Sequence, residues 1–187
     1  MESIGKPYRM QSTLNVETIN LARQGDAVVI GMLYEKYHTS VYRYLYYRVG
    51  DVHTAEDLTS EVFLRMIRYL PDYRPEGSSF QTWLFQIAHN LTVDHFRKAS
   101  NRNHVPLDEN IIAPELDMDA SIDRRLTSAR LLWGLSRLNE YQRDVIVLRF
   151  VIGLPVSEVA LTLNKTEDTI KGLQRRGLAA LRKMLTE

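Results

Sequence analysis

Apolar residues recur three and four positions apart along most of this chain, a spacing that predicts α-helices. In the first half of the chain, the pattern predicts helices over residues 14–26, 28–49, 55–69 and 80–101. In the second half, it predicts helices near residues 122–136, 140–151, 156–163 and 167–184. Strand-like alternation of any length is absent from the sequence. We therefore expect an all-α protein.

The segment between the two sets of helices, residues 105–123, has the composition of a linker. It reads VPLDENIIAPELDMDASID, with two prolines and no helical period over its first dozen residues. We therefore predict two small helical domains joined by this linker. The N-terminal domain is expected to span residues 1–104, and the C-terminal domain residues 124–187.

Charge is distributed unevenly over these three parts, although the net charge of the whole chain is only +1. The linker carries six acidic residues and no Lys or Arg, whereas residues 124–187 carry twelve Lys or Arg against six Asp or Glu. A basic domain beside an acidic linker indicates a polyanionic partner at the C-terminal end of the protein.

The stretch ALTLNKTEDTIKGLQRRG has the spacing of a DNA-binding helix-turn-helix. That motif needs a small residue in its first helix, a left-handed residue at the bend and a β-branched residue beyond it. Ala160, Asn164 and Ile170 hold these places. Asn is the non-glycine residue that best tolerates the left-handed conformation. Pro155 suits the first turn of the leading helix, and Thr166 suits the N-cap of the second helix.

The second helix of this motif carries its cations away from its predicted core stripe. At 100° per residue, the stripe consists of Ile170, Leu173, Gly177, Leu181 and Met184. In a major groove, base edges are within reach of residues near the helix start, namely Glu167, Asp168, Lys171 and Arg175. Phosphates are the expected contacts of Arg176, Arg182 and Lys183. The alternative is an ordinary basic surface helix.

The helix predicted over residues 55–69 has a leucine in the middle of a charged outer side. Its buried stripe consists of Ala55, Leu58, Val62, Met66 and Tyr69, and its opposite side of Asp57, Glu61, Leu64 and Arg68. An apolar centre with a charged rim is typical of a protein contact. One exposed leucine is also normal on a soluble protein, so both interpretations stay open at this point.

The helix predicted over residues 80–101 has aromatic, amide and charged side chains outside its core stripe. The core stripe consists of Leu84, Ala88 and Leu91, and the other side includes Trp83, Asn90, Asp94 and Arg97. Aromatic rings beside hydrogen-bonding groups can hold the unstacked bases of a single strand. Core packing is the favoured role of Trp83, since tryptophan is mostly buried, and Asp94 is expected to orient Arg97.

The sequence contains no recognisable catalytic or metal-binding motif. The chain has no cysteine, its five histidines lack metal-ligand spacing, and it contains no phosphate loop or nucleophile-and-base motif. No apolar run approaches the roughly 18 residues that a membrane span needs, and the chain start lacks a signal-peptide core. We therefore expect a cytoplasmic protein that is not an enzyme and binds no cofactor.

Two long blocks of the sequence resemble the bacterial extracytoplasmic-function (ECF) RNA polymerase sigma factors. The block VYRYLYYRVGDVHTAEDLTSEVFLRMIRYLPDYRPEGSSFQTWLFQIAHNLTVDHFRK resembles their promoter-melting domain, sigma region 2. The block LNEYQRDVIVLRFVIGLPVSEVALTLNKTEDTIKGLQRRGLAALRKML resembles their C-terminal helix-turn-helix domain, sigma region 4. The resemblance covers nearly the whole chain.

The resemblance implies partners and residue roles for this chain. RNA polymerase core would be bound through the clamp helices of its largest β-type subunit, by the side of the helix that holds Asp57, Glu61 and Leu64. The promoter −10 element would be recognised and opened by Asn90, Asp94, Arg97 and Lys98, with the loop over residues 74–79. The −35 element would be read as duplex by Glu167, Asp168, Lys171, Arg175 and Arg176.

The resemblance also bears on the linker and on regulation. The acidic linker would lie in or near the basic RNA path of the polymerase, and the alternative is an inert spacer. An anti-sigma factor is a further candidate partner. A different class of protein, a stand-alone two-domain helix-turn-helix regulator, would bind promoter duplex without polymerase and would not need the exposed Leu64.

Overall fold

The computed structural model describes residues 16–100 and 122–186, and the described residues form helices and connecting turns without any β-strand. This confirms the predicted all-α fold. The predicted linker over residues 105–123 lies outside the described residues, apart from its last two positions, which begin a helix.

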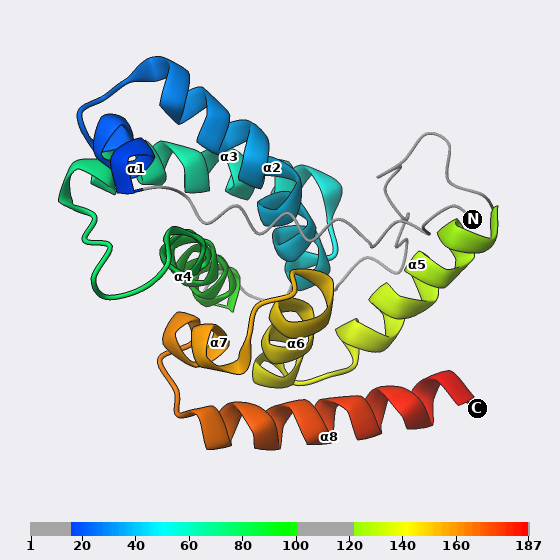
Figure 1. Ribbon diagram of the computed structural model, residues 1–187. Helices are drawn as coiled ribbons and strands as arrows, with labels where there is room; N and C mark the ends of the chain where they lie inside the picture. The colour runs from blue at the N-terminus through cyan, green and yellow to red at the C-terminus, as the bar shows by residue number, and fades with distance from the viewer. Residues whose placement is uncertain (1–15, 101–121, 187) are drawn as a thin grey trace, which may run out of the picture.

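The first four helices form the N-terminal unit of the structure (Figure 1). They are α1 (Val16–Arg23), α2 (Ala27–Val49), α3 (Val52–Tyr69) and α4 (Phe80–Ser100), with the 3₁₀ turn η1 (Leu70–Asp72) after α3. Helices α2, α3 and α4 pack against one another. Asp26 and Asp51 cap the starts of α2 and α3 by accepting hydrogen bonds from backbone N–H groups of the first turn. Gly50, with φ of 79°, ends α2 directly before Asp51.

The remaining helices form the C-terminal unit. They are α5 (Ile122–Ser136), α6 (Glu140–Ile146), the π-helical turn η2 (Val147–Val151), α7 (Val156–Thr162) and α8 (Glu167–Thr186). Helix α8 runs along one edge of the unit and packs on α5, α6 and α7 (Figure 1). A Cβ atom added to Gly177 would lie only 3.0 Å from Ile146 Cγ1, so glycine at this position lets α8 approach α6 closely.

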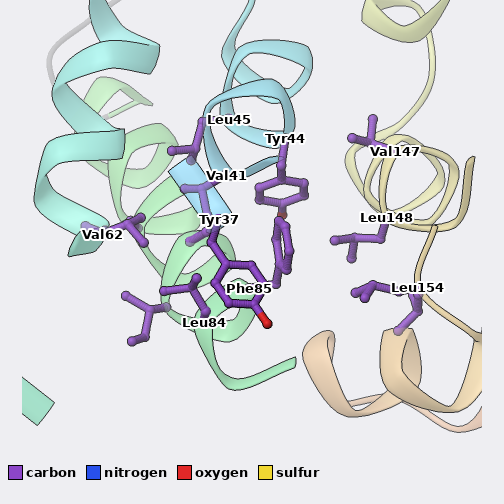
Figure 2. Packing of buried hydrophobic residues seen from close by; sticks show 14 of the residues in the cluster. Tyr37, Val41, Tyr44, Leu45, Val62, Leu84, Phe85, Val147, Leu148 and Leu154 are labelled. Carbon is purple, nitrogen blue, oxygen red and sulfur yellow. The ribbon is translucent and has the colours of Figure 1, made fainter. Parts of the chain in front are cut away.

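The buried apolar residues of the two units form one continuous cluster. Helix α4 packs on α7, and α2 packs on η2, so the cluster crosses the boundary between the units. Figure 2 shows Leu148 and Leu154 of the C-terminal unit beside Tyr44 and Phe85 of the N-terminal unit. The two units are therefore in direct apolar contact and are not simply tethered.

Most sequence-predicted helices match the structure, and the differences have local causes. Tyr69 was predicted on the buried stripe of α3, and this was wrong: its side chain is exposed, because the chain turns into η1 at this residue. The helix predicted over residues 140–151 is present, but it is α-helical only to Ile146 and continues from Val147 as a π-helical turn. Pro155 occupies the position before α7 rather than its first turn.

Candidate nucleic-acid interface

The bend between α7 and α8 is built as a Schellman motif with asparagine in the left-handed position. Asn164 has φ of 50° and is the only residue other than glycine with positive φ in the described part of the chain. Its N–H donates to Leu161 O at 3.3 Å, and the Lys165 N–H donates to Ala160 O at 2.9 Å. These two bonds satisfy carbonyl groups at the end of α7. The predicted left-handed asparagine is confirmed.

The start of α8 is fixed by a side-chain cap. The Thr169 N–H donates to Thr166 Oγ1 at 3.3 Å, which satisfies one of the free N–H groups of the first turn. The predicted core stripe of α8 is buried at Ile170, Leu173, Gly177 and Leu181 and half-buried at Met184. This stripe and the cap together fix which side of α8 faces solvent.

The side chains predicted to read a duplex are exposed on α8. These are Glu167, Asp168, Lys171, Arg175 and Arg176. Lys171 Nζ lies 3.4 Å from Asp168 Oδ1 and 3.7 Å from Glu167 Oε2. Surface pairs of this kind contribute about 0–1 kcal/mol, so they orient the lysine without preventing it from exchanging a carboxylate for DNA. The outer side of α8 thus presents a mixed but mainly cationic surface.

Helix α4 carries the second set of predicted nucleic-acid contacts. Asn90, Arg97 and Lys98 are exposed, and Asp94 is half-buried. Arg97 Nη2 donates to Asp94 Oδ1 at 3.0 Å, as expected for a carboxylate that orients the guanidinium. All of these side chains lie in the C-terminal half of α4.

Trp83, at the other end of α4, belongs to an aromatic cluster. Its ring centroid lies 4.8 Å from that of Tyr73 and 5.4 Å from that of Phe80. The side chain is half-buried and packs against the main hydrophobic cluster. The core-packing interpretation of Trp83 therefore fits the structure.

The outer side of α3 presents the predicted protein-binding residues. Leu64 is 58% exposed in the middle of α3. Asp57 is exposed on the same side, and Glu61 accepts a hydrogen bond from Arg65 Nε at 2.7 Å. We call Asp57, Glu61 and Leu64 the α3 face. It has the apolar centre and charged rim that the sequence predicted.

These three predicted sets lie on three different helices, so the structure does not bring them into one site. The α3 face, the exposed residues of α4 and those of α8 are separate surfaces, and α7 packs against both α4 and α8. Surfaces of this kind suit a protein that holds several macromolecular contacts at once.

Sequence reasoning missed a buried polar cluster between the two units. Asp144 of α6 is 1% exposed, and its Oδ1 lies 2.6 Å from Nε of the equally buried Arg48. Tyr44 donates its hydroxyl to Asp144 Oδ1 at 2.9 Å, and His89 Nδ1 lies 3.6 Å from Asp144 Oδ2. Burial first, and then the charge of Asp144, raises the pKa of Tyr44 well above its ordinary value, so the hydroxyl stays protonated and can donate.

One sequence signal points to this cluster. Arg48 follows Val41 and Tyr44 at the spacing of the buried stripe of α2, so a charged residue occupies a core position. A buried arginine needs a carboxylate or carbonyl partner. The partner itself, Asp144, is not deducible from local sequence, because it lies on a distant helix.

Two further classes of site find no support in the described residues. In this part of the chain, no helix has both the length and the apolar character that a membrane crossing requires. No cluster of three or more His, Asp or Glu residues in the same part is arranged to hold a metal ion.

Comparison with known proteins assigns the chain to one family. Residues 33–102 match the family model of Sigma-70 region 2, and residues 134–183 match that of Sigma-70, region 4. The sequence is 34% identical over 164 residues to the ECF RNA polymerase sigma factor SigX of Bacillus subtilis, covering 81% of each chain. The chain belongs to the ECF RNA polymerase sigma factors.

A second relative is more similar in sequence. This sigma factor is 41% identical over 174 residues to the ECF RNA polymerase sigma factor BldN of Streptomyces coelicolor. The match covers 92% of this chain and 66% of BldN, so the chain spans about two thirds of that relative's length.

Solved structures support the fold of this sigma factor. A structure of CnrH in complex with the cytosolic domain of CnrY has a TM-score of 0.71 at 22% identity, covering 91% of this chain and 96% of that one. The sigma factor RpoE, in complex with the anti-sigma factor NepR from Bartonella quintana, has a TM-score of 0.72 at 20% identity. That match covers 83% of this chain and 96% of the RpoE chain.

Membership in this family places the chain in a class of transcription initiation factors. Sigma factors direct RNA polymerase to promoters, and their two conserved regions correspond here to the N-terminal and C-terminal units.

Proposed function

We propose that this sigma factor binds RNA polymerase core through the α3 face, recognises the −35 element through α8, and opens the −10 element through α4. The residues on α8 are Glu167, Asp168, Lys171, Arg175 and Arg176. Those on α4 are Asn90, Asp94, Arg97 and Lys98. The protein itself catalyses no reaction, and it acts in the cytoplasm, where polymerase and promoter DNA meet.

The main observation behind this proposal is that one side of α8 is exposed to solvent. The left-handed Asn164 and the Thr166 cap set its direction, and the buried stripe turns Lys171 and Arg175 toward solvent. A helix exposed along one whole side can enter a major groove, where Arg and Lys pair with guanine edges. This geometry supports reading of a duplex by α8.

The division of the protein into regions 1–104, 105–123 and 124–187 is part of the proposal. The first region would hold core polymerase and melt the promoter, and the last would anchor the upstream duplex. The family matches over residues 33–102 and 134–183 support this assignment. An anti-sigma factor is a further candidate partner, since the RpoE relative is in complex with one.

Copurification with core polymerase tests the α3 face. Leu64→Arg and Asp57→Arg are expected to abolish binding of the full chain to purified core, because each places a cation in the contact. Glu56→Arg is the matched control. It reverses the charge of the exposed residue directly before Asp57, which lies on another side of α3, and is expected to bind core normally. Circular dichroism checks that helical content is unchanged.

Two results would count against the proposal. Normal binding of core by both α3-face variants would show that the assigned surface is wrong. Tight, sequence-specific binding of promoter duplex by the wild-type chain alone, together with no binding of core, would favour a stand-alone helix-turn-helix regulator.

A further inference from the structure

The exposed part of α4 carries one apolar side chain among its polar ones. Val93 is 44% exposed, and no other large apolar side chain in the described part of α4 is exposed. Asn90 and Arg97, which stand on either side of Val93 in the sequence, are exposed as well. Val93 therefore lies within the surface of the proposed −10 contacts.

Helical geometry puts these three side chains on one side of α4. At about 100° per residue, Val93 lies about 60° from Asn90 and about 40° from Arg97 around the helix axis. At about 1.5 Å per residue, it lies about 4.5 Å along the axis from Asn90 and about 6 Å from Arg97. The buried Leu84 is about 180° from Val93, so Val93 points away from the core stripe of α4.

Neither packing nor helix stability accounts for a valine at this position. Its side chain lies outside the core, and valine is a poorer helix former than alanine, lysine or glutamate. A contact with another molecule would account for Val93, because burial of its exposed methyl groups would stabilise that contact. The neighbouring side chains indicate the chemistry of the other molecule.

Hydrogen-bonding groups lie at fixed places around Val93. Asp94 holds the Arg97 guanidinium, since Asp94 Oδ1 accepts a hydrogen bond from Arg97 Nη2 at 3.0 Å. Asp94 is half-buried, so this pair is anchored to α4. The Asn90 carboxamide offers an acceptor oxygen and a donor NH₂ group. An apolar side chain between a carboxamide and a guanidinium fits a planar molecule that has a polar edge and a methyl group.

Thymine is the DNA base with these properties. Its O4 accepts hydrogen bonds, its N3–H donates when the base is unpaired, and its C5 carries a methyl group directly beside O4. A carboxamide such as that of Asn90 can donate to O4 and accept from N3–H at the same time. The 5-methyl group then lies at the edge of this contact, within reach of a neighbouring apolar side chain. Cytosine lacks the methyl group, so a valine at this place favours thymine.

We propose that Val93 is a specificity-determining residue of α4, which selects thymine at one unpaired position of the −10 element by contact with the 5-methyl group of the base. This inference rests on the proposed function, because it needs α4 to hold unpaired bases. It deepens that function by naming the base and the group that is recognised.

Deoxyuridine tests this contact, because it lacks only the 5-methyl group of thymidine. The full chain is bound to core polymerase, and the probe is a promoter duplex with a mismatched −10 region, so strand opening does not contribute to binding. A selection with randomised bases on the unpaired non-template strand first identifies the positions at which thymine is enriched. At one of these positions, deoxyuridine is expected to weaken binding about fourfold, the effect of one buried methyl group.

Val93→Ala removes most of the apolar contact and leaves the helix intact, since alanine is the best helix former. This variant is expected to bind the thymine and deoxyuridine templates equally and to lose the thymine enrichment at that position. Val93→Ile keeps an apolar, β-branched side chain and is expected to keep the preference. Binding of core and the circular dichroism spectrum are expected to be unchanged in both variants.

Val28→Ala is the matched control. Val28 is a valine on α2 that is 74% exposed and has no proposed contact with nucleic acid, so its replacement is expected to leave the full thymine preference. Equal binding of thymine and deoxyuridine by the wild-type protein at every position would overturn the inference. A preference of the same size in the wild-type protein and in Val93→Ala would overturn it too.

The same mismatched template separates failure of this inference from failure of the proposed function. Asn90→Ala combined with Arg97→Ala tests whether α4 holds unpaired bases at all. If this variant binds the template more weakly while Val93→Ala keeps the thymine preference, only the role of Val93 is wrong. If it binds the template as tightly as the wild-type protein, α4 does not hold unpaired bases, and the proposed function of α4 fails together with the inference.

Discussion

Helices α4 and α8 are nearly equal in length, 21 and 20 residues, but differ in how much of their surface is available. Helix α8 packs through one stripe and leaves its outer side to solvent along most of its length. Helix α4 is packed against α2 and α3 on one side and α7 on another, and its exposed residues gather in its C-terminal half. Under the proposed function, this difference fits α8 to a duplex and α4 to unpaired bases.

We expect the difference in exposure to decide which form of DNA each helix binds. A duplex groove is deep enough to take a whole helix, so a duplex-reading helix needs one free side, as α8 has. An unpaired base needs only a few hydrogen-bonding groups at a fixed place, as on α4.

The largest effect is expected for Asn90→Ala combined with Arg97→Ala on α4. In wild type, contacts from these side chains to an unstacked base would offset an unstacking cost of a few kcal/mol. Without them, promoter opening should fall on the order of a hundredfold. Binding to the upstream duplex should be unchanged. A template with a mismatched bubble at −10 should recover part of the lost transcription, whereas equal defects on both templates would contradict this role of α4.

A smaller effect is expected for Lys171→Ala and Arg175→Ala on α8. Each lost base contact should reduce discrimination for the −35 sequence by about 1–3 kcal/mol, measured by competition between specific and random duplex. Lys183→Ala, at the far end of the same helix, should weaken binding to both duplexes equally and lower the salt dependence. If the variants lose as much affinity for random duplex as for the −35 duplex, Lys171 and Arg175 contact phosphates only.

The bend that orients α8 gives a stability prediction for the C-terminal unit. Asn164→Val should destabilise the protein by roughly 1–2 kcal/mol, because a β-branched residue is strained at φ of 50°. Asn164→Gly should be tolerated, since glycine adopts positive φ freely. Urea unfolding followed by circular dichroism measures both, and equal stability of the wild-type and Asn164→Val proteins would contradict the importance of the bend.

A comparable cap in the N-terminal unit gives the smallest effect. Asp51 caps α3, and its hydrogen bonds from Thr54 lower the pKa of its carboxyl group. Asp51→Ala should therefore cost about 1 kcal/mol at neutral pH.

The sign of the pH dependence follows from the lowered pKa. The charged carboxylate stabilises the folded state at pH values above its ordinary pKa of about 4, and this contribution is lost as pH falls through the lowered folded pKa. Asp51→Asn should keep much of the cap and remove this pH dependence. Acid unfolding curves that are identical for the wild-type protein and the Asp51→Asn variant would show that the charge contributes nothing.

The features that sequence predicted correctly are set by local chemistry. Asn164 and Thr166 act within a few residues of their own positions, so their roles follow from spacing and residue type alone. The exposure of Leu64 also follows from helical period. Tyr69 was misplaced because periodicity does not show where a helix gives way to a turn.

The contact between the units could not be predicted in the same way. Tyr44 and Asp144 are 100 residues apart, and their hydrogen bond exists only because two helical units distant in sequence pack together. Sequence can show that Arg48 occupies a core position and needs a partner, but local pattern does not name the partner. The arrangement of the units is therefore the part of the account that required a structure.

Permanganate footprinting of promoter thymines, run beside duplex binding for each variant, tests the division between α4 and α8 most directly. With Asn90→Ala and Arg97→Ala, upstream binding should be normal and the thymines at −10 should stay unreactive. With Lys171→Ala and Arg175→Ala, upstream binding should be weak, and thymine reactivity should recover in part at high protein concentration. Normal thymine reactivity in the α4 variant, or full upstream affinity in the α8 variant, would show that the two helices do not divide these roles.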